Sequence, residues 1–210
     1  MRFYSRSVRK GHQVAKAFTL VELLFVVTLL ILMVSVAGVG VPAALASQRL
    51  SSAARQLSAD LNKVALVARK ENRVVELRFY LMDSVLNPGQ AMAYRAYQTG
   101  LVAGWDGDGN PETQFATDVV LLPEDVVIMP DEKYNTLHQL ELMKNEDPNR
   151  ADGSSYVSYF IQSNGSTSLP QDKPAVMTLV REKGGDIPTI LPTDYRSVVI
   201  NPQTHQTRVY

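Results

Sequence analysis

Cysteine is absent from this 210-residue chain, so the protein forms neither a disulfide nor a thiolate metal site. The three histidines, His12, His138 and His205, lie far apart in the sequence, and no carboxylates accompany them in the way a zinc site needs. The sequence also lacks a glycine-rich phosphate loop, a serine-nucleophile motif and an HExxH pattern. We therefore predict that the protein is not an enzyme and needs no cofactor.

Acidic residues are missing from the first 21 positions, where five basic residues occur. These are Arg2, Arg6, Arg9, Lys10 and Lys16. The remainder of the chain carries 16 lysines and arginines against 21 aspartates and glutamates, so it is mildly acidic. A surface of this sign does not attract nucleic acid, and we predict no nucleic-acid partner for the globular part.

One long apolar run, residues 18–41, follows the basic segment 1–17. As a helix, these residues would measure about 36 Å, which is enough to cross a hydrocarbon core of about 30 Å. Because the basic residues precede the run, the positive-inside rule keeps residues 1–17 in the cytoplasm and exports the rest. Glu22 lies inside the run, although a carboxylate in hydrocarbon costs about 2–3 kcal/mol.

Three interpretations of this segment compete. A secretory signal would be cleaved after Ala46, at the small-residue pattern Ala44-Leu45-Ala46. A plain signal anchor would remain uncut, and Glu22 would then have no role. In the third interpretation Glu22 has a function, which the sequence around it indicates.

The stretch "AFTLVELL", with its basic leader and membrane-length apolar run, resembles the processing site of type IV prepilins and pseudopilins. The resemblance implies that prepilin peptidase cleaves between Ala17 and Phe18, and that Phe18 becomes the N-methylated terminus. Ala17 stands where the family usually has glycine, and both residues are small. Glu22 would attract the new amine of a neighbouring subunit during filament assembly, because a charge pair in low dielectric is strong only when both members are present.

The resemblance also implies a function, a location and partners. The protein would be a minor pilin or pseudopilin, a structural subunit of a type IV pilus-like or type II secretion-like filament. It would cross the bacterial inner membrane once, with a periplasmic C-terminal domain, before entering a periplasmic or surface filament. Its partners would be prepilin peptidase, other pilin or pseudopilin subunits and the inner membrane. The alternative is a membrane-tethered or secreted β-domain that binds a ligand and joins no filament.

Residues 42–72 continue as a predicted amphipathic helix, because apolar side chains recur every three, four or seven positions. Its apolar stripe consists of Leu50, Ala53, Ala54, Leu57, Leu61, Val64 and Ala68. Residues 73–210 read as six to eight mostly antiparallel strands, with a terminal hairpin that turns around residues 201–206. We expect an α+β fold in which one long N-terminal helix, a membrane half followed by an amphipathic half, packs on this exported sheet as in pilins.

Two later segments strengthen the resemblance to minor pseudopilins of the GspH/FimT type. These are "YFIQSNGS", a strand that leads into a glycine turn, and "VVINPQT" in the terminal hairpin. Residues 132–150 read as a short helix followed by a polar loop. We interpret this segment as a solvated surface insertion, and the alternative is a loop that binds a partner.

The stretch "GWDGDGNPET" offers oxygen ligands at alternate positions, as calcium loops do. The candidates are Asp106, Asp108, Asn110 and Glu112. An EF-hand would have glycine at its sixth position and glutamate at its twelfth, but Pro111 and Thr117 stand there. The same residues are typical of a plain turn, so both a turn and a calcium site remain open.

Overall fold

The computed structural model describes residues 19–84, 88–89, 92–115, 117–144 and 154–210, but not the side chains of residues 35–43. The predicted leader, residues 1–17, therefore lies outside the described residues. The chain divides into two compact units, Met1–Ala44 and Leu45–Tyr210. Most of the structure, including every strand, belongs to the second unit.

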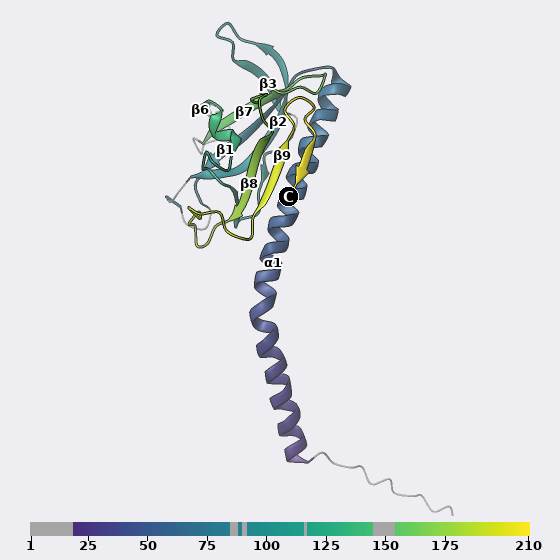
Figure 1. Cartoon of the computed structure of the whole chain (residues 1–210), viewed down its shortest axis with the longest axis vertical. Helices are drawn as coiled ribbons and strands as arrows, with labels where there is room; N and C mark the ends of the chain where they lie inside the picture. Colours follow the sequence, from purple (N-terminus) through teal and green to yellow (C-terminus); the bar gives the residue numbers. More distant parts are fainter. Residues whose placement is uncertain (1–18, 85–87, 90–91, 116, 145–153) are drawn as a thin grey trace, which may run out of the picture. The chain divides into compact units, whose positions relative to one another are not determined.

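Helix α1 runs from Leu20 to Glu71 (Figure 1). Within the second unit the predicted apolar stripe is confirmed, because Leu50, Leu57 and Leu61 are fully buried and Val64 is 7% exposed. The intervening lysines and arginines lie off this face, as the helical period requires.

A left-handed residue ends α1. Asn72 has a φ of 48°, and asparagine is one of the few non-glycine residues that adopt this conformation readily. The amide of Asn72 donates to the carbonyl of Arg69, and the amide of Arg73 donates to the carbonyl of Ala68. This pair of bonds is a Schellman motif, which satisfies carbonyls that the helix end would otherwise leave without donors.

The predicted fold class, with a long N-terminal helix packed on the sheet, is wrong. Side chains of α1 are described in two short helical stretches, residues 20–34 and 44–71. Neither stretch is a long apolar helix. Only the second stretch contributes to the hydrophobic core. Hydropathy predicts helix in both, but a local pattern does not reveal which helical residues find a packing partner. The fold is mostly antiparallel sheet.

In the part of the chain that the structure describes, ten antiparallel strands form one sheet in the order β10-β9-β8-β5-β2-β1-β7-β6, with β3 and β4 pairing beside β2. The strands are β1 Val75–Met82, β2 Ala93–Trp105, β3 Pro111–Phe115, β4 Val120–Leu121, β5 Val126–Ile128, β6 Leu142–Lys144, β7 Ser155–Ile161, β8 Ala175–Arg181, β9 Arg196–Ile200 and β10 Thr207–Val209. The long strand β2 pairs with four others, β1, β3, β4 and β5, and so joins both halves of the sheet.

The main core lies between the second stretch of α1 and one face of the sheet. Alternate side chains of β1, Val75, Leu77 and Phe79, point into it, as the strand period predicts. Of the intervening residues of β1, Glu76 and Tyr80 are buried as well, since Thr113 of β3 bonds to Glu76 and Tyr156 of β7 packs on Tyr80.

The terminal hairpin is confirmed. Strands β9 and β10 pair in register, with Thr207 opposite Ile200, and the chain turns through residues 201–206. Helix α1 covers the outer strand, because the side chain of Asn62 both accepts from the amide of Thr207 and donates to its hydroxyl. A strand edge bonded in this way is not free to pair with another chain.

The segment interpreted as a solvated insertion is buried in part, so that interpretation is wrong. A 3-10 helix, η1 (Thr136–Gln139), takes the place of the expected short helix, and the side chain of Asn135 caps it by accepting from the amide of Leu137. Asn135 and Leu137 are each 1% exposed, while His138 is exposed. Polar residues dominate the sequence here, which hid the contribution of Leu137 and Leu140 to the core. Residues 145–150 of this segment lie outside the described residues.

Candidate functional site

The predicted processing residues Ala17 and Phe18 lie outside the described residues. The described residues begin at Thr19, the second residue after the expected cleavage point. Of the residues tied to processing and assembly, Glu22 is therefore the one that the structure places.

Glu22 lies in the first turn of α1 and forms a capping box with Thr19. Oε2 of Glu22 accepts from the amide and from the hydroxyl of Thr19, each at 2.9 Å, and the amide of Glu22 donates to Oγ1 of Thr19 at 3.2 Å. Such reciprocal bonds satisfy amides that a helix start leaves free. Sequence reasoning missed this role, although the spacing Thr-x-x-Glu before an apolar run is its signal.

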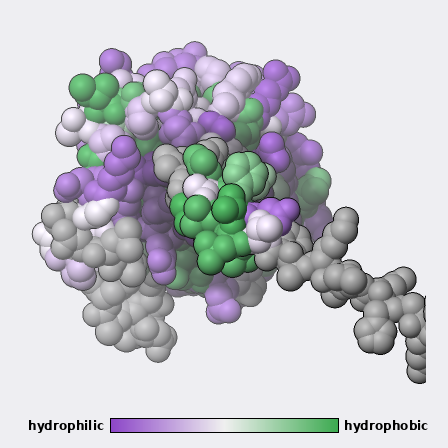
Figure 2. Space-filling view, turned by 90° about the horizontal axis from the view of Figure 1, so that it is seen from below, coloured by the Kyte–Doolittle hydropathy of each residue, from purple (hydrophilic) through white to green (hydrophobic). Residues whose placement is uncertain are grey.

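The apolar side chains on both sides of Glu22 are exposed to solvent in the first unit. Figure 2 shows this stretch as a green group of apolar atoms. The large exposed residues are Leu20, Val21, Leu23, Leu24, Phe25, Val26, Val27, Leu29, Leu30, Ile31, Leu32, Met33 and Val34. A continuous apolar surface of this kind marks a site that contacts lipid or another protein. None of the helices described is both long enough and apolar enough to span a bilayer.

Asp106 organises the turn between β2 and β3 with its carboxylate. Oδ1 accepts from the amides of Asp108 and Asn110, at 3.0 and 2.7 Å, and Oδ2 accepts from the side-chain amide of Asn110 at 3.0 Å. These hydrogen bonds lower the pKa of Asp106, those from the side chain and amide of Asn110 most. Gly109, with a φ of 84°, supplies the left-handed residue that closes the turn.

The calcium candidates are thus brought into one hairpin, where Asp106 and Asn110 bond to each other. Asp108 and Glu112 are exposed, and Glu112 belongs to strand β3. Within the part of the chain that the structure describes, no three histidine, aspartate or glutamate side chains are grouped as a metal site needs. Both oxygens of Asp106 already have donors within the turn, so a cation at this carboxylate would have to displace them.

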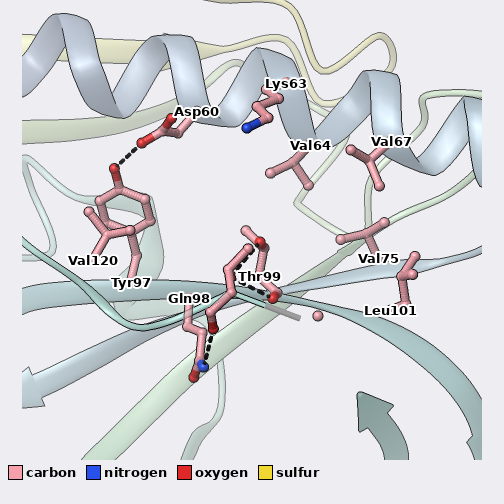
Figure 3. Close-up of a pocket in the computed structure, with 12 residues that line it drawn as sticks. Asp60, Lys63, Val64, Val67, Val75, Tyr97, Gln98, Thr99, Leu101 and Val120 are labelled. Atoms are coloured by element: carbon pink, nitrogen blue, oxygen red, sulfur yellow. Dashed lines mark hydrogen bonds between the residues drawn. The ribbon is translucent and has the colours of Figure 1, made fainter. Parts of the chain in front are cut away.

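A cavity of about 320 Å³ opens between α1 and strand β2 in the second unit. Figure 3 shows Val64 and Val67 on the helix side, facing Val75 and Leu101 on the sheet side. Its volume lies at the lower end of the range for ligand pockets, which are mostly apolar with a few fixed polar groups. Neither hydropathy nor a motif indicated this cavity, because its walls come from segments separated in sequence.

Polar side chains at the cavity have partners of their own, with one exception. The phenol of Tyr97 donates to Oδ2 of Asp60 at 2.5 Å, and the side-chain amide of Gln98 donates to the carbonyl of Thr117 at 2.9 Å (Figure 3). Burial, and then the hydrogen bond to Asp60, raise the pKa of Tyr97, so the phenol keeps its proton. Among the described residues, the ammonium of Lys63 has no hydrogen bond or ion pair.

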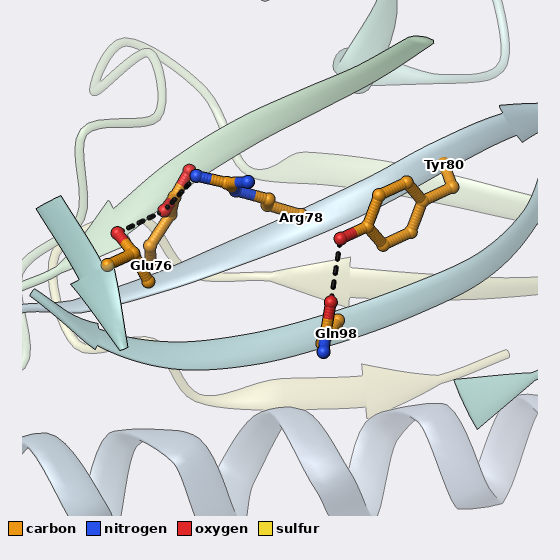
Figure 4. A network of polar contacts seen from close by, with 5 residues as sticks. Glu76, Arg78, Tyr80 and Gln98 are labelled. Carbon is orange, nitrogen blue, oxygen red and sulfur yellow. Dashed lines mark hydrogen bonds and ion pairs between the residues drawn. The ribbon is translucent and has the colours of Figure 1, made fainter. Parts of the chain in front are cut away.

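The opposite face of β1 holds a buried charge pair (Figure 4). Glu76, whose side chain is fully buried, accepts two hydrogen bonds from the guanidinium of Arg78, at 2.8 and 3.0 Å, and a third from Thr113. The guanidinium also lies 4.6 Å from the ring centre of Phe115 and 4.3 Å from that of Tyr156. The pair holds β3 on the sheet, because Thr113 bonds to Glu76 and the ring of Phe115 packs on the guanidinium of Arg78. It exposes no reactive group.

A second buried pair joins β2 to the end of β8. Nη2 of Arg95 lies 2.7 Å from Oε2 of Glu182, and both side chains are nearly inaccessible. The hydroxyl of Ser84 donates to the other carboxylate oxygen at 3.0 Å, and Nε of Arg95 donates to the carbonyl of Met82 at 3.2 Å. Every strong group of the pair is satisfied, which is typical of a structural element.

His205 is buried beside Tyr159. Its Nε2 lies 2.9 Å from the phenol oxygen of Tyr159, whereas Nδ1 is buried without a partner among the described residues. Burial, and then the nearby positive charge of Arg69, lower the pKa of His205 to about 4. The imidazole is therefore neutral at pH 7 and acts as a packing group in the hairpin.

In comparisons with known proteins, no family model, no curated protein and no solved structure matches the chain.

Proposed function

We propose that the protein is a minor pilin or pseudopilin, a structural subunit of a type IV pilus-like or type II secretion-like filament. Prepilin peptidase cleaves it between Ala17 and Phe18, Phe18 becomes N-methylated, and the subunit assembles through its N-terminal helix. Its partners are the peptidase, other subunits of the filament and the bacterial inner membrane, with residues 73–210 on the periplasmic side. The protein acts by binding its neighbours and catalyses no reaction.

The exposed apolar stretch that starts at Leu20 is the single observation that carries this proposal. A run of leucine, valine and isoleucine side chains that no described residue of the first unit covers requires an apolar environment. Lipid supplies that environment before assembly, and the equivalent stretches of neighbouring subunits supply it afterwards. Exchange between two apolar surroundings costs little, so subunits can leave the membrane for a filament.

The capping box supports the role of Glu22 in this assembly. Among the described residues, both bonds from Thr19 reach Oε2, so Oε1 has no donor. One oxygen is thus occupied by the helix cap, and the other is free for the amine that cleavage creates on Phe18 of a neighbour. Because the cap fixes the side chain, Glu22 loses less conformational freedom when that amine binds.

Cleavage-site variants test the proposal. In a host that contains prepilin peptidase, wild type and Ala17→Gly should lose residues 1–17, whereas the bulky Ala17→Leu should keep them. Membrane insertion, measured by protease protection, should be equal in all three variants, and only the cleaved ones should co-purify with other subunits of the filament. Full retention of residues 1–17 in wild type and in Ala17→Gly would contradict the proposal.

A ligand-binding β-domain that joins no filament is the second candidate. The cavity beside Val64 and Leu101 favours it, because its size and apolar walls suit a small molecule. The two candidates differ at the N-terminus, since a binding module needs no new terminus at Phe18. Such a module would retain ligand binding when Glu22 is replaced and would never co-purify with filament subunits.

A further inference from the structure

The cavity between α1 and β2 has the composition of a site for an amphiphile. Its helix wall contains Val64 and Val67, and its sheet wall contains Val75 and Leu101 (Figure 3). At about 30 Å³ for each heavy atom, the share of one water in the liquid, its 320 Å³ would hold roughly ten heavy atoms. An alkyl chain fits such walls, and each methylene removed from water strengthens binding about fourfold.

The polar groups at the cavity differ in whether another described residue bonds to them. Oδ2 of Asp60 accepts a hydrogen bond from the phenol of Tyr97, and the side-chain amide of Gln98 donates to the carbonyl of Thr117. Each of these two side chains therefore already has a hydrogen-bond partner. Lys63 differs, because it is exposed at the same site and no described residue pairs with its ammonium. A cation without a partner beside an apolar cavity is complementary to an anionic head on an apolar tail.

We propose that this cavity binds a medium-chain aliphatic carboxylate, with its alkyl chain between the valines and its carboxylate on Lys63. The inference rests on residues of the second unit alone and does not depend on cleavage or filament assembly. Decanoate is the natural probe, since its alkyl chain beyond the carboxylate has about as many heavy atoms as the cavity holds.

Photolabelling tests this site in the full-length protein reconstituted in lipid nanodiscs. A decanoate analogue with a diazirine near its methyl end should label peptides that contain Val64, Val67 or Leu101, as read by mass spectrometry. Unlabelled decanoate should compete with the label, whereas decanol should compete less well and decyltrimethylammonium least. Equal competition by decyltrimethylammonium would overturn the proposal and point to Asp60 as a cation site.

Filling the cavity provides the matched variants. Val67→Trp and, from the opposite wall, Val120→Phe should each abolish labelling of the cavity peptides. Leu66→Trp is the control, because Leu66 is 64% exposed on the same helix and does not line the cavity. Thermal unfolding identifies any variant that fails to fold. Labelling unchanged in both folded, filled variants would show that the probe enters from lipid at random, and it would overturn the proposal.

Replacing the cation separates the head group from the tail. Lys63→Gln should weaken competition by decanoate about two- to fivefold, the range of an exposed ion pair, and leave competition by decanol unchanged. Lys70→Gln is the control, since Lys70 is exposed near the end of the helix, 3.6 Å from Glu71 and outside the cavity. Equal competition in wild type and Lys63→Gln would overturn the assignment of Lys63.

Discussion

The carboxylate of Glu22 accepts two hydrogen bonds from Thr19, one from its backbone amide and one from its hydroxyl, each at 2.9 Å. The acid at this position therefore has a local structural role as a helix cap, besides the charge pairing that the proposed function assigns to it. The two roles make different demands on the side chain, and substitutions can distinguish them.

Glu22→Gln removes the charge and keeps an oxygen that can accept from Thr19, while Thr19→Val removes one cap donor and keeps the charge. Because assembly in our account requires the charge, Glu22→Gln should reduce co-purification with filament subunits at least tenfold, as Glu22→Ala should. Thr19→Val should reduce it less than threefold. Affinity purification with quantitative immunoblotting measures the effect, and membrane insertion of each variant is the control. Normal incorporation of Glu22→Gln would show that Glu22 serves only as a cap.

His205 should make the globular unit less stable in acid. Its pKa is about 4 in the folded protein and 6.5 when unperturbed, so the unfolded chain binds the proton first as the pH falls. The free energy of unfolding should be unaffected above pH 6.5 and should fall between about pH 6.5 and pH 4, by up to about 1.4 kcal/mol for each pH unit.

The matched variants are His205→Asn and His138→Asn. Asparagine tolerates the φ of 56° at position 205, so the first removes the titrating group without backbone strain. The second removes an exposed histidine. Urea unfolding followed by circular dichroism should show a smaller loss of stability between pH 7 and pH 4.5 in His205→Asn only. An identical loss in all three proteins would assign the effect to other groups.

The buried pair of Arg95 and Glu182 should be critical for folding. Removal of one partner leaves the other charge buried and unpaired, so Arg95→Met should lower the free energy of unfolding by about 3–5 kcal/mol. Asp194→Asn is the contrasting change, because Asp194 pairs with Arg181 and Arg196 at a site that is about 30% exposed. It should cost at most about 1 kcal/mol. Equal losses in the two variants would mean that burial does not set the energy of these pairs.

The turn at Asp106 offers a direct test of calcium binding. Since the carboxylate already accepts three hydrogen bonds from Asp108 and Asn110, we expect the turn to need no cation. Terbium should therefore give no saturable emission sensitised by Trp105, the adjacent and sole tryptophan. A saturable signal that calcium displaces and Asp106→Asn abolishes would establish the cation site instead.

Acid should loosen the same turn. The pKa of Asp106 is lowered below the ordinary value of 3.8, so its bonds contribute above that pH and are lost as the pH falls through the folded value. Backbone amide exchange at Asp108 and Asn110, divided by the intrinsic exchange rate at each pH, should thus rise in wild type as the pH falls through the folded pKa of Asp106. In Asp106→Ala it should already be fast at neutral pH.

Local periodicity predicted the parts of the fold that depend on neighbours in sequence. The stripe from Leu50 to Ala68 and the alternation in β1 follow from helix and strand geometry, and the burial of Leu57 and Phe79 agrees with them. The terminal hairpin was also predictable, because its strands are separated by a short polar turn.

Long-range features were not predictable from one sequence. Arg95 and Glu182 are 87 positions apart, and Glu76 reads as the polar side of a strand although it is fully buried. The cavity beside Lys63 depends in the same way on how α1 meets β2. The packing of the N-terminal helix was mispredicted, since an apolar run predicts a helix and does not identify what covers it.

Mass spectrometry of the amino terminus of the protein, purified from membranes of its native host, tests the central claim most directly. The account predicts a chain that begins at Phe18 and carries one additional methyl group on its amine. A chain that begins at Met1 or at Ser47 would contradict it, because no new amine would then exist for Glu22 of a neighbouring subunit to bind.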